Sequence, residues 1–135
     1  METVIVDASL LLSLILPDES TKPESESFRH KFQSNQLLAI APPLLKYEVV
    51  NVLRSAIVRQ RCTAIVSQAL LSEFQKLPIS YQETNFANTL SLAIKHNLSV
   101  YDASYLDLAL RLHHPLYSLD HHLSQLASGQ IQPNL

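Results

Sequence analysis

The sequence predicts an α/β protein in which a central, mostly parallel sheet lies between two layers of helices, a three-layer α/β/α fold. Short apolar runs at residues 4–6, 37–41 and 115–120 are typical of buried strands. Longer stretches whose apolar residues recur at helical spacing separate these runs. Strands that alternate with helices pair in parallel and carry helices on both faces of the sheet. At 135 residues the chain has the size of one domain, and we expect a single domain over residues 1–135.

The first part of the chain is expected to form a strand, two helices and a second strand. The strand at 4–6 leads into a very apolar helix that stops at Pro17. A helix that is apolar on nearly every side has to be covered on more than one side. A polar loop over 17–27 and a short exposed helix over 25–35 then precede the strand at 37–41.

Further helices are predicted after the second strand. The stretch 44–61 places its apolar residues on one helical face, which consists of Leu45, Val49, Val52, Leu53, Ala56 and Ile57. Thr63 can cap the next helix, and Asn97 can end a later one in a left-handed conformation. The remaining predicted elements are a helix over 64–77, a weak strand at 78–81, a helix over 83–96, a helix over 98–114 that opens near Asp102, a helix over 121–127 and an edge strand near Ile131.

Composition and charge exclude several classes of protein. The chain is 47% hydrophobic and 16% charged, which is ordinary for a globular protein and unlike a disordered one. The formal charge is -2, with 10 Lys and Arg against 12 Asp and Glu, so no overall basic field attracts nucleic acid. Any binding of nucleic acid must therefore be local or assisted by a metal.

Cysteine usage and the N-terminal sequence predict a soluble cytoplasmic protein. Cys62, the single cysteine, cannot form an internal disulfide and lacks the paired spacing of a zinc site. Glu2 stands where a signal peptide carries basic residues, Asp7 interrupts the apolar stretch, and no small-residue cleavage site follows. No stretch reaches the roughly 20 apolar residues that a membrane helix needs. We therefore expect an intact N-terminus and no membrane partner.

Three aspartates occur where a helix is expected to begin. Asp7 follows the run at 4–6, Asp102 stands near a helix start, and Asp120 ends the run at 115–120. Each of them can be no more than a helix N-cap, because a carboxylate accepts the unpaired N–H groups of the first turn. Ligands of parallel α/β sheets, however, bind outside the carboxyl ends of the strands. The sequence therefore predicts that these carboxylates lie at one rim of the sheet.

Glu48 is a fourth candidate and is harder to explain as a surface charge. Helical spacing stacks it on Leu44 and Val52, beside the apolar stripe of its helix. An ionised carboxylate that loses water there is destabilised by several kcal/mol unless it is paired. We expect a cation or a hydrogen-bond donor next to Glu48. Asn51 lies on the same side of the helix and can hydrogen-bond Glu48 or its neighbours.

Four carboxylates brought together require a cation. Two unit charges ~4 Å apart repel by about 1 kcal/mol in water and by about 4 kcal/mol at an effective dielectric constant of 20. An all-oxygen, acidic site selects Mg²⁺ or Mn²⁺ over zinc. Hydrolysis of a phosphodiester by an activated water, at a site with one or two ions, is the chemistry that follows. This chemistry needs no nucleophilic Ser, Cys or His, and the chain has neither a Ser-His-Asp spacing nor a glycine-rich loop.

Four segments resemble the PIN-domain family and, within it, the VapC-like toxin ribonucleases of bacterial type II toxin–antitoxin pairs. They are VIVDASLLLSLILPDE, APPLLKYEVVNVL, LSVYDASYLDLAL and YSLDHHLSQLA, which occur in this order and span residues 4–127. The resemblance implies a PIN-like fold and an endoribonuclease that depends on Mg²⁺ or Mn²⁺. It also implies an RNA substrate, a cognate antitoxin protein and a homodimer.

The resemblance also assigns roles to residues. Asp7 matches the family's first-strand aspartate, Glu48 the glutamate of its Glu-x-x-Asn motif, and Asp102 the aspartate of its Tyr-Asp-Ala segment. Asp120 matches the aspartate that usually follows Thr-x, and Ser118 stands where that threonine is usual. The four carboxylates would be metal ligands and catalytic groups. The hydroxyl of Ser118 can still order a carboxylate or a water.

Other polar residues have less specific patterns. Ser9 can place its hydroxyl near the metal or only cap its helix, and the pattern favours neither. Lys46 and Arg54 can form a basic rim for RNA phosphates. Asp107 lies about 140° around its helix from Asp102, so we expect it to face solvent or a partner. The adjacent histidine pairs diverge on a helix, which favours surface histidines over a zinc site.

Other functions fit parts of the pattern. A PIN-like module without catalysis can bind RNA or protein, but it gains nothing from a complete set of acids. A phosphoacceptor signalling domain needs adjacent acids after the first strand and a lysine after the last, and this chain has neither. The apolar clusters at 10–16 and 64–71 belong in the core or, where they are exposed, in a groove for an antitoxin segment. The metal-dependent ribonuclease is therefore the leading hypothesis.

Overall fold

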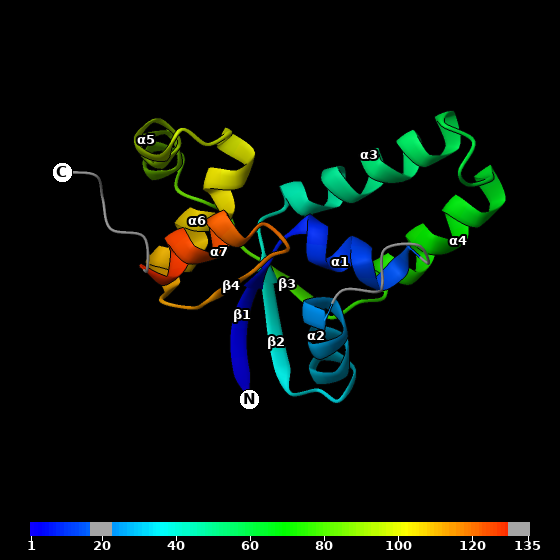
Figure 1. The fold of residues 1–135 in the computed structure, drawn as a ribbon, viewed down its shortest axis with the longest axis horizontal. Coiled ribbons are helices and arrows are strands. Elements are labelled where there is room, and N and C mark those ends of the chain that lie inside the picture. The colour runs from blue at the N-terminus through cyan, green and yellow to red at the C-terminus, as the bar shows by residue number, and fades with distance from the viewer. Residues whose placement is uncertain (17–22, 130–135) are drawn as a thin grey trace.

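The computed structural model describes residues 1–16 and 23–129, which form a parallel sheet flanked by helices (Figure 1). The strands are β1 (Glu2–Val6), β2 (Leu37–Ala41), β3 (Ile79–Tyr81) and β4 (Leu116–Tyr117). They lie side by side in the order β3-β2-β1-β4, and every neighbouring pair is parallel. The predicted parallel sheet is therefore confirmed.

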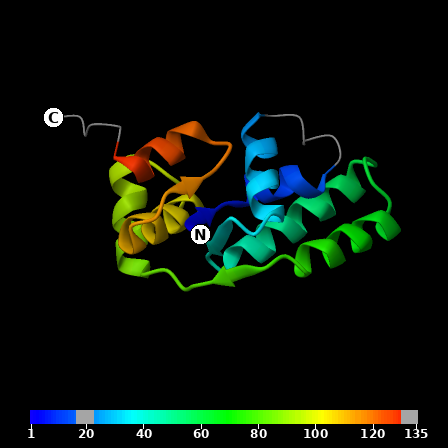
Figure 2. The ribbon, with the colours of Figure 1, turned by 90° about the horizontal axis from the view of Figure 1, so that it is seen from below.

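Helices cover both faces of the sheet. The described residues contain α1 (Ala8–Ile15), α2 (Pro23–Gln33), α3 (Leu44–Val58), α4 (Ala64–Gln75), α5 (Phe86–His96), α6 (Val100–Leu112) and α7 (His121–Ser128). In the two perpendicular views, α5, α6 and α7 lie on one side of the strands and α1 to α4 on the other (Figures 1 and 2). This arrangement is the three-layer α/β/α fold that the sequence predicts.

Several helix ends follow the sequence signals. Thr63 caps α4, because its hydroxyl oxygen accepts the N–H of Val66 at 3.2 Å. Asn97 ends α5 in the left-handed region, with φ 53°. At the start of α6 the cap is Ser99, whose hydroxyl oxygen accepts the N–H of Asp102 at 3.0 Å. Asp102 therefore lies in the first turn of α6 and is not its cap.

The helix α2 differs from the exposed helix that the sequence predicts. It begins at Pro23, inside the predicted polar loop, at the position where a proline wastes no N–H group. Phe28 and Phe32 are buried, and their ring centroids lie 5.2 Å apart in an edge-to-face pair. Charged residues dominate this stretch of the sequence, so its pattern does not indicate that Phe28 and Phe32 form a small apolar face. The rest of the predicted loop, 17–22, and the strand near Ile131 lie outside the described residues.

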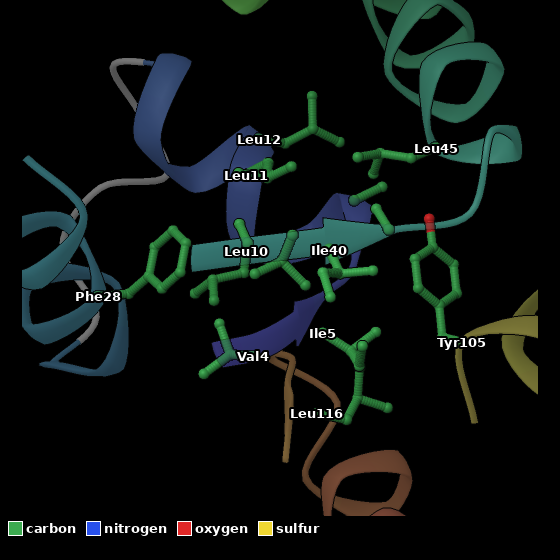
Figure 3. Close-up of a cluster of buried hydrophobic side chains, with 14 of the residues drawn as sticks. Val4, Ile5, Leu10, Leu11, Leu12, Phe28, Ile40, Leu45, Tyr105 and Leu116 are labelled. Carbon is green, nitrogen blue, oxygen red and sulfur yellow. The ribbon is translucent and has the colours of Figure 1, made fainter. Parts of the chain in front are cut away.

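The core is centred on β1 and α1. Val4, Ile5 and Val6 have no exposed surface, because β1 is paired on both edges and covered on both faces. Figure 3 shows Val4 and Ile5 among side chains from α1, α2, β2 and β4. The apolar helix α1 buries Leu10, Leu11 and Leu12 together, as a helix covered on several sides should. No helix within the described ranges is long and apolar enough to cross a bilayer.

Candidate active site at the carboxyl edge of the sheet

Asp7 leaves the buried strand β1 where the chain turns into α1. Val6 is paired with Tyr117 of β4, so the residues that follow them, Asp7 and Ser118, meet at the carboxyl edge of the sheet. Asp7 is only 7% exposed. Its Oδ1 accepts the N–H of Leu10 at 3.2 Å, which makes Asp7 the N-cap of α1. The cap role and a position at the predicted rim therefore coexist in one residue.

Two serine hydroxyls hold the carboxylate of Asp7. Ser9 donates to Oδ1 at 2.7 Å, and Ser118 donates to Oδ2. Each serine also accepts a backbone N–H from the loop after β4: Ser9 that of Leu119 at 3.1 Å, and Ser118 that of Asp120 at 2.9 Å. The hydroxyl of Ser9 therefore binds the carboxylate of Asp7 and the loop after β4 together, and Asp7 rather than Ser9 caps α1.

Burial raises the pKa of the Asp7 carboxyl group above its ordinary value of 3.8. Hydrogen bonds from Ser118, Ser9 and the N–H of Leu10 lower this pKa, whereas the negative charge of Asp102 raises it. The net rise means that the ionised carboxylate is destabilised in its surroundings. A cation nearby would stabilise the ionised form.

Asp102 faces the same region from the first turn of α6. Its side chain is partly buried. Burial raises its pKa, the charge of Asp120 raises it further, and a hydrogen bond with Ser99 lowers it. Asp120 itself is exposed and caps α7, with its Oδ1 accepting the N–H of Leu123 at 3.2 Å. The two aspartates therefore lie close enough to repel each other.

Glu48 lies in α3 and is partly buried. Its Oε1 accepts a hydrogen bond from the hydroxyl of Tyr105, 57 residues further along the chain, at 2.5 Å. The predicted donor next to Glu48 is therefore Tyr105, and Asn51 is exposed on the surface of the helix. Burial raises the pKa of Glu48, the hydrogen bond from Tyr105 lowers it, and the charges of Asp7 and Asp102 raise it.

Sequence reasoning missed Tyr105 as a polar residue. It placed Tyr105 in the apolar pattern of its helix, and the side chain is indeed 1% exposed. The signal that was available was the hydroxyl itself, because a buried tyrosine normally finds a hydrogen-bond partner. Helical spacing alone cannot show that this partner comes from α3.

We call Asp7, Glu48, Asp102 and Asp120 the acidic cluster, because the negative charge of at least one of these residues raises the pKa of Asp7, of Glu48 and of Asp102. The charge of Asp102 acts on Asp7 and on Glu48, the charge of Asp7 acts on Glu48, and the charge of Asp120 acts on Asp102. Within residues 1–16 and 23–129, however, no three His, Cys, Asp or Glu side chains converge into a group able to hold a metal ion. The acidic cluster is therefore loose and is not a closed set of ligands.

A hard divalent cation fits the chemistry of this cluster. All of its donors are carboxylate oxygens, which Mg²⁺ and Mn²⁺ prefer. Mg²⁺ usually keeps several waters and takes only one or two carboxylates directly, so it does not require a closed cage. A cation would also offset the burial and the repulsion that raise the pKa values of Asp7, Glu48 and Asp102.

The predicted basic residues lie on the surface, and of the paired histidines His113, His121 and His122 are exposed whereas His114 is partly buried. Lys46 and Arg54 are both exposed on α3. The Nζ of Lys46 lies 4.3 Å from the ring centroid of Tyr81, a cation–π contact at the end of β3. His121 is exposed and lies 3.1 Å from the carboxylate of Glu24. No histidine in the described part of the chain joins a group that could hold a metal ion.

The prediction that Asp107 faces solvent or a partner is wrong. Asp107 is 2% exposed, and its Oδ2 accepts the N–H of Asn85 at 2.9 Å and a hydrogen bond from Arg111 at 3.4 Å. Arg111 also donates to the carbonyl oxygen of Glu83 at 3.1 Å. The helical angle gives the direction of Asp107 on α6, but it does not reveal that the segment leading into α5 covers that side.

Comparison with known proteins gives related chains of similar length. No family model matches the chain. Ribonuclease VapC3 of Pyrobaculum aerophilum is 30% identical over 135 residues, which cover 96% of this chain and 98% of that protein. The crystal structure of PAE2754 from Pyrobaculum aerophilum has a TM-score of 0.67 and 22% sequence identity, and the match covers 96% of this chain and 90% of that chain.

A second solved structure has the same fold. VapC20 of Mycobacterium tuberculosis, described as a toxin that cleaves the sarcin-ricin loop, has a TM-score of 0.66 with 14% sequence identity. The match covers 96% of this chain and 99% of that chain. At these identities the two structures support the fold, and the sequence similarity to the ribonuclease extends over nearly the whole chain.

Proposed function

Because the chain belongs to the VapC family of PIN-domain ribonucleases, we propose that it is the toxin of a toxin–antitoxin pair and hydrolyses RNA phosphodiester bonds as an endoribonuclease. The observation that supports this most directly is the acidic cluster at the carboxyl edge of the sheet, with Asp7 fixed by Ser9 and Ser118. A single PIN domain over residues 1–135 and a cytoplasmic location are part of the same proposal.

The acidic cluster would hold Mg²⁺, with Mn²⁺ as a substitute. Its ligands would be Asp7, Glu48, Asp102 and Asp120, bound directly or through water, because all four offer only carboxylate oxygens. A bound divalent ion supplies Lewis-acid activation of water and neutralises charge on the phosphate.

The groups of the protein itself would orient the reactants and take up a proton. Asp7 is held at both oxygens by Ser9 and Ser118, so its orientation is set by the protein. Glu48 is held at Oε1 by Tyr105. A carboxyl group with a raised pKa accepts a proton more readily, so Asp102 is our candidate for the base that accepts a proton from the attacking water.

RNA would meet local positive charge beside the acidic cluster. Lys46 and Arg54 are exposed on α3, the helix that carries Glu48. Contacts from such side chains to phosphate groups are electrostatic and weaken with salt. Because the whole chain has a formal charge of -2, we propose that RNA binding depends on these local contacts and on the cation.

Cleavage of total RNA in Mg²⁺ or Mn²⁺ tests the proposed activity. Asp7→Asn and Asp102→Asn should each reduce the rate on the order of 100-fold or more, as loss of a catalytic group commonly does. The control is Glu73→Gln, which changes an exposed acid on α4 whose carboxylate lies 3.3 Å from the Nζ of Lys76. Asn variants that cleave as fast as the parent would show that the mechanism is wrong.

The second candidate is a catalytically inactive PIN-like module that binds RNA or protein. It is favoured by one observation, the absence of three converging ligands among the described residues. Calorimetric titration with Mn²⁺ separates the two candidates. Binding that is weakened by Asp102→Asn supports the nuclease, whereas RNA binding by a parent protein that takes up no divalent ion supports the module.

We further propose that the cognate antitoxin binds an apolar groove between α1, α3 and α4. The groove has a volume of about 630 Å³, and its apolar lining includes Leu16, Val52, Ala56, Val66 and Leu70. Such a groove suits the apolar face of a helical segment. Val66 is exposed at the edge of the groove, and Val66→Glu should abolish inhibition by the antitoxin while RNA cleavage persists.

We also propose that the protein is a homodimer. On α5, Phe86, Leu90 and Ile94 are 76%, 56% and 75% exposed and recur every four residues. Side chains at this spacing form one continuous apolar stripe, which we call the α5 stripe. A contiguous exposed apolar surface of this kind is typical of an interface. A second copy would cover it with the same surface.

A further inference from the structure

Tyr105 combines a fully buried ring with a polar contact to the acidic cluster. Its side chain is 1% exposed, and Figure 3 shows the ring at the edge of the core with its hydroxyl oxygen directed toward the beginning of α3. The hydroxyl donates to Oε1 of Glu48 at 2.5 Å. A hydroxyl buried in this way is destabilising without a partner, so the contact is a fixed part of the packing.

The position of Tyr105 connects the elements that carry the acids. Asp102 lies three residues earlier on α6, which puts the two side chains on the same face of the helix. Glu48 belongs to α3, on the other side of the sheet. The backbone of Ala8, which follows Asp7, also acts on the Tyr105 hydroxyl through a hydrogen bond. One phenol group therefore touches α3 and the start of α1 from α6.

We propose that Tyr105 is a positioning residue of the ribonuclease site, whose hydroxyl fixes the carboxylate of Glu48 through Oε1 and leaves the other oxygen for a divalent ion. The inference rests on the proposed function, because it assigns a role toward the ion that the acidic cluster would hold. Carboxylates that bind metals are commonly oriented by a second hydrogen bond of this kind. Ser9 and Ser118 provide the corresponding contacts for Asp7.

The hydroxyl acts as a donor and does not take up the reaction's proton. Burial, the hydrogen bond to Glu48 and the charges of Glu48 and Asp7 all raise the pKa of Tyr105 above its ordinary value of 10.0. The phenol is therefore protonated near neutral pH and donates to Oε1 of Glu48. Tyr105 touches neither the ion nor the RNA in this proposal, and it acts only through Glu48.

Tyr105→Phe tests the inference, because it removes the hydroxyl and keeps the ring. The matched control is Tyr117→Phe, which removes a hydroxyl that donates to another carboxylate, Oε1 of Glu2, at 2.8 Å. Calorimetric titration with Mn²⁺ should give a dissociation constant about 10- to 100-fold higher for Tyr105→Phe than for the parent. Tyr117→Phe should match the parent. In RNA cleavage, kcat at a fixed Mn²⁺ concentration should fall while KM for RNA changes little.

A cycle with Glu48→Gln separates positioning from a general effect on the fold. If Tyr105 acts through Glu48, adding Tyr105→Phe to Glu48→Gln should weaken Mn²⁺ binding little further. An equal loss in both backgrounds would show that the hydroxyl acts by another route, and it would overturn the inference. Urea unfolding in EDTA measures the same pair without metal. The losses in the free energy of unfolding caused by Tyr105→Phe and Glu48→Gln should not add in the double variant.

The outcomes distinguish the inference from the proposed function. Mn²⁺ affinity that is unchanged in Tyr105→Phe overturns the inference and leaves the nuclease proposal standing. Failure of the parent to bind Mn²⁺ or to cleave RNA overturns the proposed function, and the role of Tyr105 toward an ion falls with it. Selective loss in Tyr105→Phe, with Tyr117→Phe unaffected, supports both.

Discussion

The hydroxyl of Ser118 donates directly to Oδ2 of Asp7, although the two residues are 111 positions apart in the chain. The contact exists because β1 and β4 are parallel neighbours whose last paired residues are Val6 and Tyr117. The segments that follow β1 and β4 therefore leave the sheet at the same edge and side by side. The register of two strands thus determines the orientation of a carboxylate at the candidate active site.

Ser118→Ala should impair the site more than it impairs the fold. The substitution removes a hydrogen bond that lowers the pKa of Asp7 and leaves Oδ2 free to turn. We expect a 10- to 100-fold loss of Mn²⁺ affinity and of RNA cleavage, together with a loss of about 1 to 2 kcal/mol in the free energy of unfolding. Calorimetry, a cleavage assay and urea unfolding measure the three quantities.

Ser118→Thr is the control for this prediction, since threonine keeps the hydroxyl. It should retain most of the activity and metal affinity of the parent. If Ser118→Ala and Ser118→Thr lost activity equally, the retained hydroxyl would not preserve the site, and the role assigned to its hydrogen bond with Asp7 would be wrong.

Asp102→Asn should make the metal-free protein more stable while removing its activity. The charge of Asp102 raises the pKa values of Asp7 and Glu48, so its removal relieves repulsion in the acidic cluster. Because Asp102 is partly exposed, water screens part of this effect, and we expect a rise in Tm of roughly 2 to 4 °C in EDTA. Added Mg²⁺ should raise the Tm of the parent more than that of the variant. A lower Tm for the variant in EDTA would contradict the prediction.

The acidic cluster should also give the metal-free protein a defined pH dependence. The pKa values of Asp7, Glu48 and Asp102 lie above their ordinary values of 3.8, 4.5 and 3.8. Between the ordinary and the raised value the folded protein binds more protons than the unfolded chain, so these groups lower the free energy of unfolding as the pH rises. We expect the free energy of unfolding of Asp102→Asn, measured with urea in EDTA, to rise relative to that of the parent between about pH 4 and about pH 7. A difference in the free energy of unfolding between variant and parent that stays constant over this pH range would contradict the prediction.

Local patterns in the sequence predict the elements well, and contacts between distant segments escape them. The strand at Leu37–Ala41 and the cap at Thr63 follow from apolar runs and capping chemistry, which are local properties. The aspartates at the rim follow from strand ends in a parallel sheet. The bond between Tyr105 and Glu48 and the burial of Asp107 depend on which segments pack together. No spacing within one helix contains that information.

Asp107→Ala should reduce stability without weakening metal binding. The carboxylate is buried and holds the N–H of Asn85, the cap of α5, together with Arg111. Its loss leaves that N–H without its partner, so we expect the free energy of unfolding to fall by about 1 to 3 kcal/mol. Mn²⁺ affinity of the folded variant should match the parent. Arg111→Ala should have a smaller effect, because Arg111 is partly exposed.

The α5 stripe should carry the homodimer contact. Leu90 lies at its centre, 56% exposed, and a charge at this position cannot be accommodated in an apolar interface. Leu90→Glu should therefore convert the protein to a monomer, as measured by analytical ultracentrifugation. Because the side chain is already largely exposed in one copy of the chain, the variant should keep its fold and its Mn²⁺ affinity.

A second substitution separates the stripe from the helix that carries it. Lys95 is exposed on α5, one residue beyond Ile94, and lies outside the α5 stripe. Lys95→Glu therefore changes the charge of α5 but leaves the stripe unchanged. The dimer should survive this change, since about 100° of helical rotation separates neighbouring residues. A Leu90→Glu protein that sediments like the parent would show that the α5 stripe does not hold two copies together.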